Sequence, residues 1–395
     1  MLRVLAVQNY RSIGSLVVPL GALNVVTGPN GSGKSNLYRA LRLLAETARG
    51  GAIEALAREG GLASCFWAGP ENISRRMREA QVPIEASVRK GARRLRLGFG
   101  GDDFGYAIAF GLPQSNSGEN HQRPSAFSLD PEIKLESIWA GEVCRPAATL
   151  VERKGPLVRT RDGRSWAVVE QHLPSFEGLL SHPLATDACP EPARLRVRML
   201  GWRFYDHFRT DPQAPARQPR LGTRTPVLHH DGRDLAAALQ TIREIGDPEA
   251  LDAAIEDAFP GSTLRIVARD GLFTLELSQA GLLRPLTAAE LSDGTLRYLL
   301  LIAALLTPRP PTLMVLNEPE TSLHPDLLPA LGRLIVQASM RGQVWVVSHA
   351  NRLVAALREA SDCNCLVLEK HVGQTAIQGQ EGLLDQPAWR WPDQG

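Results

Sequence analysis

The pattern of apolar positions in the last third of the chain predicts helices that alternate with strands. Short runs rich in β-branched and aliphatic residues are typical of buried strands, and apolar residues three or four positions apart are typical of helices. The predicted elements are a helix at 296–306, a strand at 312–316, a helix at 326–339, a strand at 343–347, a helix at 353–360 and a strand at 366–368. This alternation indicates a mostly parallel sheet flanked by helices.

In the first third of the chain, the apolar pattern predicts strands followed by a helix. We expect residues 2–27 to form two strands joined by a turn around Gly14, and the β-branched run at 23–27 suits a buried strand. A helix follows, with apolar residues at helical spacing: Leu37, Ala40, Leu41 and Leu44. An antiparallel β-lobe comes next, because turn signals at 90–91 and 100–103 separate three β-like runs, 84–88, 94–99 and 106–112.

The middle of the chain lacks a sustained pattern. Residues 114–232 combine a polar loop at 115–120 and a proline-rich stretch at 211–220 with two short strand-like runs, 149–153 and 165–170. We expect an irregular α+β insertion here, without coiled-coil heptads. After it, the pattern predicts helices at 235–239 and 251–259 and a hairpin at 264–277 that turns on Asp270-Gly271.

Composition changes this picture little. The length of 395 residues predicts one large domain with an insertion, or two domains. A hydrophobic content of 44% and a charged content of 22% are typical of a soluble globular enzyme, and the net charge of +2 does not decide whether the partner is a polyanion. Of five cysteines only Cys363 and Cys365 lie close together, too few ligands for a zinc site, so we expect reduced thiols.

The ends of the chain and its longest apolar run bear on location. Residues 1–9 contain no signal-peptide pattern, and the apolar run at 298–306 is too short to span a bilayer. We therefore expect a cytoplasmic protein without a membrane partner. The tail after Lys370, which contains Trp389 and Trp391, is expected to be loosely held.

An eight-residue motif carries the strongest chemical signal. Residues 28–35 read Gly-Pro-Asn-Gly-Ser-Gly-Lys-Ser, the G-x-x-x-x-G-K-S pattern of a phosphate loop, between a predicted strand and a predicted helix. In such a loop backbone N–H groups surround the phosphates, Lys34 reaches the β and γ oxygens, and the Ser35 hydroxyl ligates Mg²⁺. This context favours ATP binding over a chance glycine turn, and the candidate nucleotide-binding residues are Asn30, Gly31, Ser32, Gly33, Lys34, Ser35 and Asn36.

The strand at 313–318 has the form of a Walker B element with one departure. Asn317 stands where an aspartate usually holds a Mg²⁺-bound water, so we expect it to reach the metal through water. Glu318, the next residue, is the candidate general base that orients the attacking water. The alternative for Glu318 is an acidic residue at a strand end that faces solvent.

Three further segments complete the pattern. The signature loop, residues 291–295, precedes an apolar helix and places Ser292 and Gly294 at its positive end, where a γ-phosphate could bind. Residues 321–325 follow Glu318 and resemble a D-loop, the name used for them below. A later strand ends in His349, which resembles the switch histidine that contacts a γ-phosphate. Taken singly, Ser292 is an ordinary N-cap and His349 a surface histidine.

Together these segments resemble the ABC-type ATPase head of the RecF/SMC class, and in particular RecF-like predicted ATPases with the segment Asn-Glu-Pro-Glu-Thr-Ser-Leu-His-Pro at 317–325. The resemblance implies two heads that clamp two ATP molecules. Lys34 and Ser35 would act in cis, and Ser292 and Gly294 in trans. It places Arg11 near the nucleotide, although a plain exposed arginine is an equal alternative, and Gln114 matches the Q-loop poorly.

The resemblance also implies a division of the chain. We expect the N-terminal half of the head at 1–114, an inserted subdomain at 115–232, the C-terminal half of the head at 233–372 and a tail at 373–395. Some relatives of this class carry long coiled coils or a Toprim nuclease domain, and we expect neither a coiled coil nor a nuclease activity in this chain. The predicted enzyme is a slow ATPase that uses ATP and Mg²⁺.

Two functions remain open for this ATPase. The first is a homodimer that acts on DNA in repair or genome maintenance, which arginine clusters support weakly. The second is a nucleotide-gated switch in phage defence or signalling that acts on an unidentified protein partner, and a transporter subunit is disfavoured. The arginine clusters are Arg75, Arg76 and Arg78; Arg89, Lys90, Arg93, Arg94 and Arg96; and Arg209, Arg217, Arg220 and Arg224.

Overall fold

The computed structural model describes residues 1–69, 93–113, 126–127, 129–184, 189–360, 362–380, 382 and 385–393. These residues form two compact units, each treated by itself below. The first unit comprises residues 1–20, 28–201 and 366–395, and the second unit comprises residues 21–27 and 202–365. Several predictions fall outside the described residues: the strand at 84–88, the turn at 90–91, the loop at 115–120, Gln114, and the basic residues Arg75, Arg76, Arg78, Arg89 and Lys90.

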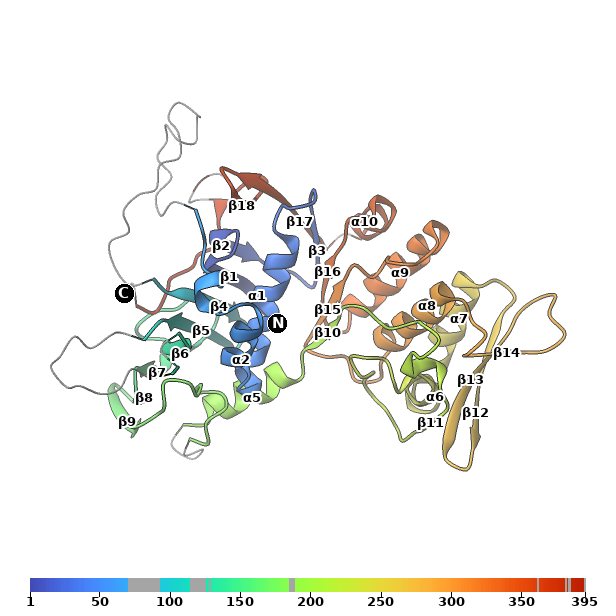
Figure 1. Ribbon diagram of the computed structural model, residues 1–395, viewed down its shortest axis with the longest axis horizontal. Helices are drawn as coiled ribbons and strands as arrows, with labels where there is room; N and C mark the ends of the chain where they lie inside the picture. Colours follow the sequence, from blue (N-terminus) through green and yellow to red (C-terminus); the bar gives the residue numbers. More distant parts are fainter. Residues whose placement is uncertain are drawn as a thin grey trace. The chain divides into compact units, whose positions relative to one another are not determined.

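The first unit is built on an eight-stranded antiparallel sheet (Figure 1). The strand order is β2-β1-β4-β5-β6-β7-β8-β9, and every neighbouring pair is antiparallel. The strands are β1 (Leu2–Tyr10), β2 (Ile13–Pro19), β4 (Leu95–Gly101), β5 (Phe104–Gly111), β6 (Glu132–Ala140), β7 (Thr149–Lys154), β8 (Leu157–Asp162) and β9 (Ser165–Glu170). The predicted antiparallel lobe is present in β4 and β5.

Two details of this sheet differ from the prediction. The chain reverses at Arg11 and Ser12, not at Gly14, because Tyr10 pairs with Ile13 and Arg11 adopts a left-handed φ of 49°. Residues 132–170 are also more regular than expected. Tight turns at Gly155 and Gly163, both with positive φ, let β7, β8 and β9 extend the sheet one after another.

Helices of the first unit cover this sheet. They are α1 (Lys34–Arg49), α2 (Ala52–Arg58), α3 (Leu62–Cys65) and α5 (Glu191–Leu200). Helix α1 packs against β1, β4, α2 and α5. The apolar stripe predicted from the sequence is the face that it buries, since Leu37, Leu41 and Leu44 are each fully enclosed.

The C-terminal tail is held in place, contrary to expectation. Strand β17 (Cys363–His371) and strand β18 (Gln374–Ile377) form an antiparallel hairpin. Farther on, the Trp389 ring lies between Trp139 and Trp391, with centroid separations of 5.7 and 5.1 Å. Trp391 is buried in a small apolar cluster of the first unit. These aromatic contacts are distant in sequence, so local periodicity gave no sign of them.

The second unit contains the predicted parallel sheet. Its strands lie in the order β10 (Arg203–Tyr205), β15 (Leu313–Asn317), β16 (Gln343–Val347) and β3 (Leu23–Thr27), and each neighbouring pair is parallel. The strands β15, β16 and β3 are almost continuously buried, as a parallel sheet covered on both faces requires. This order confirms the predicted α/β fold class.

The helices of the second unit are close to those predicted. They are α6 (Leu235–Ile245), α7 (Pro248–Ala258), α8 (Asp293–Leu305), α9 (Leu328–Ser339) and α10 (Asn351–Arg358), with 3-10 turns η1 (Pro215–Arg217) and η2 (Pro325–Leu327). Helix α8 is apolar on all sides and is the centre of the unit's core. Helices α9 and α10 pack on β16 and β3.

A small antiparallel sheet completes the second unit. It consists of β11 (Arg220–Leu221), β12 (Thr263–Arg269), β13 (Leu272–Ser278) and β14 (Leu286–Thr287). The β12–β13 hairpin turns on Asp270 and Gly271, as predicted, and both residues have a positive φ, the geometry of a two-residue hairpin turn. Among the described residues, no helix has the length and apolar character needed to cross a membrane.

Candidate functional site

The phosphate loop, residues 28–35, connects β3 to α1 through backbone that only glycine adopts easily. Gly28 and Gly33 have φ values of 143° and 112°. A Cβ on Gly28 would lie 2.2 Å from the Leu368 carbonyl oxygen, and one on Gly33 would lie 2.1 Å from Thr375 Oγ1. The hairpin of β17 and β18 therefore presses against this loop and fixes its path.

The loop and the start of α1 have the features of an anion site. The Lys34 side chain is buried, and its ammonium donates to the carbonyl oxygens of Gly28 (2.6 Å) and Pro29 (3.1 Å). Ser32 is buried and its hydroxyl has no hydrogen-bond partner among the described residues. No side chain in the described part of the protein caps the first turn of α1, and that turn contains no acidic residue, so its N–H groups can receive a phosphate.

The other predicted residues of the loop are placed differently. Asn30, Gly31 and Ser35 are exposed, so they can meet a ligand from solvent. Asn36 instead donates to the Ser12 hydroxyl at 2.8 Å, and that hydroxyl is 2.7 Å from Thr375 Oγ1. The side-chain amide of Asn36 therefore ties the beginning of α1 to the turn between β1 and β2.

Arg11 is neither free nor simply exposed. Its guanidinium forms an ion pair with Glu59 at 2.8 Å, and the same carboxylate oxygen accepts the Tyr10 hydroxyl at 2.7 Å. Burial alone would raise the pKa of Glu59, but the hydrogen bonds from Tyr10 and Arg11 outweigh it and lower that pKa. The predicted contact of Arg11 with a nucleotide stays a prediction.

In the second unit, β15 and β16 end side by side and carry the candidate hydrolytic residues. Asn317 closes β15 and pairs with Val347. The Glu318 N–H donates to the Val347 carbonyl oxygen at 2.8 Å, and Glu318 has a left-handed φ of 49°. A non-glycine residue rarely adopts this conformation unless its surroundings impose it. His349 follows β16, and its Nδ1 lies 3.7 Å from Glu318 Oε1.

Glu320, which the sequence analysis did not select, organises this edge. Its side chain is only 6% exposed, and Oε1 accepts from the Ser348 hydroxyl (2.8 Å) and from the N–H groups of His349 (3.0 Å) and Ala350 (3.2 Å). The His349 ring nitrogen Nδ1 is 3.4 Å from the same oxygen. A buried carboxylate requires such donors, so Glu320 fixes the backbone that carries His349.

A buried arginine of α8 lies behind the same edge. The Arg297 guanidinium donates to His207 Nδ1 at 3.1 Å and approaches the Glu318 carbonyl oxygen at 3.5 Å. Burial lowers the pKa of Arg297, and the charge of Glu320 opposes this effect. Glu318 and Glu320 stand on either side of Pro319. The Glu-Pro-Glu sequence was therefore the signal that could have drawn attention to Glu320.

The signature loop and the D-loop lie together in the second unit. Ser292 caps α8 by accepting the Thr295 N–H at 3.1 Å, and a Cβ on Gly294 would lie 2.9 Å from the Ser322 carbonyl oxygen. Both loops line an open pocket of about 700 Å³, formed by Phe259, Ser292, Gly294, Thr295, Ser322, Leu323, His324, Pro325, Asp326 and Leu327. Ser292 is thus both an N-cap and an accessible hydroxyl at the positive end of a helix.

Arg217 holds the signature loop, a role that the sequence analysis missed. This buried guanidinium donates to the carbonyl oxygens of Ala288 (2.9 Å) and Leu291 (2.7 Å) and to Asp293 Oδ1 (2.8 Å). Arg217 belongs to one of the arginine clusters that the sequence offers as candidate DNA-binding residues. Its position excludes a phosphate contact, because the side chain is buried and saturated with acceptors.

Most of the other described arginines of the candidate clusters have protein partners. Arg94 and Arg96 form ion pairs with Asp393 of the tail, and the Arg93 guanidinium lies over the Phe66 ring. Arg209 pairs with Asp211, and Arg224 lies 3.7 Å from Glu244. Arg220, on β11, is exposed. These contacts favour the alternative that the clusters are structural.

Comparisons with known proteins agree on the type of protein. A family model described as "AAA domain, putative AbiEii toxin, Type IV TA system" matches residues 23–136 and 170–355, more than half of the chain. A search of curated proteins gave no match.

Several solved structures are similar to this chain. An SMC head bound to the C-winged helix domain of ScpA is 13% identical, with a TM-score of 0.50, and the match covers 95% of this chain and 97% of that one. The SMC head domain from Thermotoga maritima is 15% identical with a TM-score of 0.47, and the match covers 95% and 97%. An Smc head with an extended coiled coil, bound to the C-terminal domain of ScpA from Pyrococcus furiosus, is 12% identical with a TM-score of 0.47, and the match covers 95% of each chain.

The likeness to the first of these heads confirms the predicted fold, that of an ABC-type, SMC-like ATPase head. The family match covers the segment from β3 through α1 and the segment from β10 to α10. The chain therefore belongs to the AAA domain family described as putative AbiEii toxin, Type IV TA system, and is an ATPase of the AAA and SMC-head type.

Proposed function

We propose that this protein is a slow Mg²⁺-dependent ATPase that dimerises around two ATP molecules. One observation carries the proposal: Glu318 and His349 meet at the carboxyl ends of β15 and β16, and β3 ends at the same sheet edge. The Ser348 N–H, directly before His349, donates to the Val26 carbonyl oxygen at 3.1 Å. The phosphate loop begins two residues after Val26, and parallel sheets bind ligands beyond this edge.

The residues of the phosphate loop fit a polyphosphate. Lys34 exchanges the loop carbonyls for β and γ oxygens. The Ser32 hydroxyl and the first N–H groups of α1, which lack side-chain partners among the described residues, supply neutral donors. Ser35 would hold Mg²⁺ directly, and Asn317 would hold it through water. When bound, Mg²⁺ neutralises charge that develops on the transferred phosphoryl group.

Glu318 and His349 have different roles in hydrolysis. The Glu318 carboxylate accepts a hydrogen bond from the attacking water and orients it toward the γ-phosphate. His349, held by Glu320, contacts the γ-phosphate. Asn317 carries no charge, so its contact with a metal-bound water is weaker than that of an aspartate, and slow turnover follows.

Dimerisation follows from the signature loop. Ser292 and Gly294 line an open pocket formed by Phe259, Ser292, Gly294, Thr295 and residues 322–327, all of the second unit. In the class of ATPase heads that this chain resembles, the signature loop of one head faces the ATP held by the other. We infer that these donors serve the ATP held by a second copy of the chain, with Arg217 keeping the loop in shape for that contact.

Two biological roles use the same ATPase cycle. Action on DNA in repair or genome maintenance is the role that the RecF resemblance favours, although most described arginines of its candidate clusters are engaged within the protein. The second is a nucleotide-gated switch in phage defence or signalling with a protein partner, and the family description as a putative toxin favours it.

A turnover assay separates these roles. ATP hydrolysis is measured with Mg²⁺ alone and with duplex, single-stranded or gapped DNA, and ATP-dependent DNA binding is measured in parallel. Stimulation or binding supports the role in DNA repair. If DNA has neither effect while basal hydrolysis persists, the switch is the better description and its partner remains to be isolated.

A further inference from the structure

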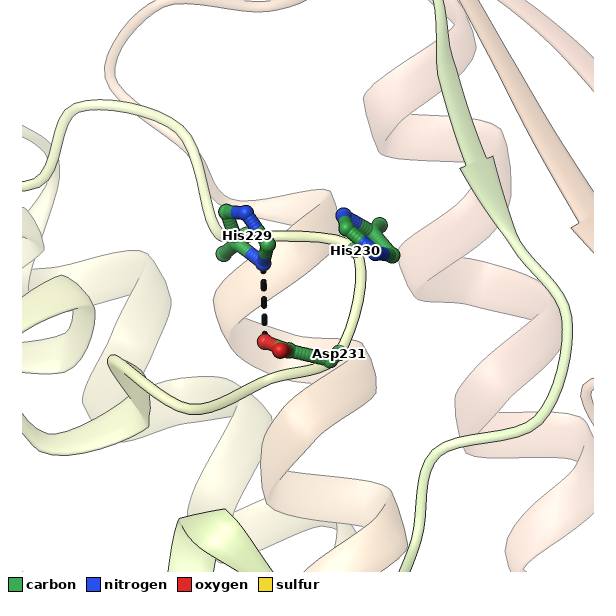
Figure 2. Close-up of side chains that lie close together, drawn as sticks. All are labelled: His229, His230 and Asp231. Carbon is green, nitrogen blue, oxygen red and sulfur yellow. Dashed lines mark hydrogen bonds and ion pairs between the residues drawn. The ribbon is translucent and has the colours of Figure 1, made fainter.

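Three metal-ligating side chains meet on one loop of the second unit, outside the ATPase machinery. His229, His230 and Asp231 each offer one ligand atom, and these atoms all lie within 4.8 Å of one another (Figure 2). His229 Nδ1 is 2.8 Å from Asp231 Oδ1, and the two imidazole rings lie 4.1 Å apart between centroids. None of the three has a role in the proposed ATPase cycle.

The loop that carries them is well anchored. Just before it, the Leu228 carbonyl oxygen accepts the Tyr205 hydroxyl at 2.9 Å. The His229 N–H donates to the Asp234 carboxylate at 3.0 Å, and the His229 carbonyl oxygen accepts the Gly232 N–H at 2.9 Å. Because these bonds fix the backbone on both sides, the ligand set is assembled before any ion arrives, which lowers the entropy cost of binding.

Close packing on α8 adds to this rigidity. Gly232 has a φ of 70°, and a Cβ on it would lie 2.3 Å from Leu300 Cδ2. Only glycine permits this approach of the loop to the central helix. The Arg233 N–H donates to Asp231 Oδ1 at 3.1 Å, so the carboxylate has a supporting contact of the kind that orients metal ligands.

We propose that His229, His230 and Asp231 form a site for a borderline divalent transition metal, with Zn²⁺ as its typical occupant. Two imidazole nitrogens and one carboxylate oxygen are ligands of this class, and water completes a four-coordinate shell. Bonds of about 2.0–2.2 Å place tetrahedral ligands roughly 3.3 Å apart. The His229–Asp231 pair is already close to this spacing, and the exposed His230 offers a third ligand atom within 4.8 Å of both.

The ligand types distinguish this site from the proposed Mg²⁺ site of the ATPase. Mg²⁺ prefers six oxygen ligands, so it competes poorly for two imidazoles. A Zn²⁺ ion on His229 Nδ1 would take the place of the hydrogen that this nitrogen shares with Asp231, and the neutral imidazole would then carry its single N–H on Nε2. The bound ion then links the start of the loop to the segment that leads into α6 and stabilises the second unit.

The test uses the full chain without nucleotide, after dialysis against a chelator. ZnCl₂ is titrated calorimetrically, and CoCl₂ is titrated in parallel because its visible spectrum reports the coordination number. We expect one tight equivalent of Zn²⁺, a four-coordinate Co²⁺ spectrum, no displacement by MgCl₂, and a higher unfolding temperature with Zn²⁺. Since no ATP is present, the result is independent of the proposed ATPase function.

Matched variants decide where the ion binds. The double variant His229→Ala/His230→Ala should weaken Zn²⁺ binding about 100-fold or more, since even indirect partners of a metal affect affinity about 10- to 100-fold. The control His172→Ala/His371→Ala also removes two exposed histidines and should bind like wild type. Asp231→Asn tests the site if the double variant fails to fold, with the expectation of weaker Zn²⁺ binding and an altered Co²⁺ spectrum. Equal affinities of wild type and the His229 and His230 variant, or an unaltered spectrum in Asp231→Asn, would overturn the proposal.

Discussion

The buried carboxylate of Glu320 provides the sharpest test of how the hydrolytic edge is built. Replacing it with glutamine keeps the shape of the side chain and removes its charge, whereas alanine removes the acceptor altogether. All three short hydrogen bonds to this side chain end on Oε1, and they come from Ser348, His349 and Ala350. Both substitutions therefore act on the backbone that carries His349.

The structure sets the size of the effect. A hydrogen bond to a charged group contributes about 1.5–3 kcal/mol and a neutral one about 0.5–1.5 kcal/mol, so neutralising Glu320 weakens three bonds by about 3 kcal/mol in total. Relief from burying a charge offsets part of this loss, which leaves about 1–2 kcal/mol for Glu320→Gln. Glu320→Ala leaves buried donors without a partner and should lower the free energy of unfolding by about 3–5 kcal/mol.

Urea unfolding measures these differences, and turnover measures their effect on function. We expect a lower kcat in both variants with ATP affinity unchanged, because Lys34 holds the phosphates from another segment, and Gln should retain more activity than Ala. Glu359→Gln, which alters an exposed carboxylate of the same unit at the end of α10, should change neither property. Wild-type stability in Glu320→Ala, or unchanged kcat in both variants, would refute the role given to Glu320.

Three further predictions address metal, dimer and pH. Asn317→Asp should lower the Mg²⁺ concentration for half-maximal turnover about fivefold, since a charge-assisted bond contributes roughly 1 kcal/mol more than a neutral one; an unchanged Mg²⁺ titration contradicts this. Ser292→Arg should abolish the ATP-dependent dimer seen by light scattering and leave ATP bound to the monomer; a persisting dimer excludes the proposed role of the signature loop. Because folding lowers the pKa of Glu59, the ionised carboxylate stabilises the folded protein fully at any pH above 4.5, the ordinary pKa of a glutamate. This stabilisation is lost as the pH falls through the pKa that Glu59 has in the folded protein. Glu59→Gln should therefore reduce stability at neutral pH, and progressively less as pH falls below 4.5 and through the folded pKa, as measured by urea unfolding across a pH series.

The parts of the fold that local patterns govern were predictable. Runs of apolar residues located β15, β16 and β3, because strands buried on both faces have no polar positions. The glycine at the second position of the β12–β13 turn identified that hairpin. The phosphate loop was evident for a related reason, since its chemistry needs glycines at a fixed spacing.

The parts that depend on contacts distant in sequence were not predictable. The tail is held by Trp139 and by Arg94 and Arg96, which nothing near Trp389 indicates. Arg217 looked like one more surface charge because its acceptors lie more than 70 residues away. The predicted division at 114, 232 and 372 stays a prediction, as do the roles of the individual site residues.

Glu320 is an intermediate case. Its position after Pro319 marked it as part of the motif, but only the structure shows that its oxygen accepts the backbone N–H groups of His349 and Ala350. A buried acid and an exposed acid are indistinguishable in sequence until the donors around them are known.

The central claim is an ATPase cycle in which Glu318 drives hydrolysis and ATP joins two heads. The most direct test is light scattering of Glu318→Gln at micromolar concentration with ATP and Mg²⁺, together with its turnover rate beside that of wild type. We expect the variant to bind ATP, to hydrolyse none and to accumulate as a dimer, whereas wild type turns over slowly. A variant that stays monomeric with ATP bound, or that hydrolyses ATP as fast as wild type, would contradict it.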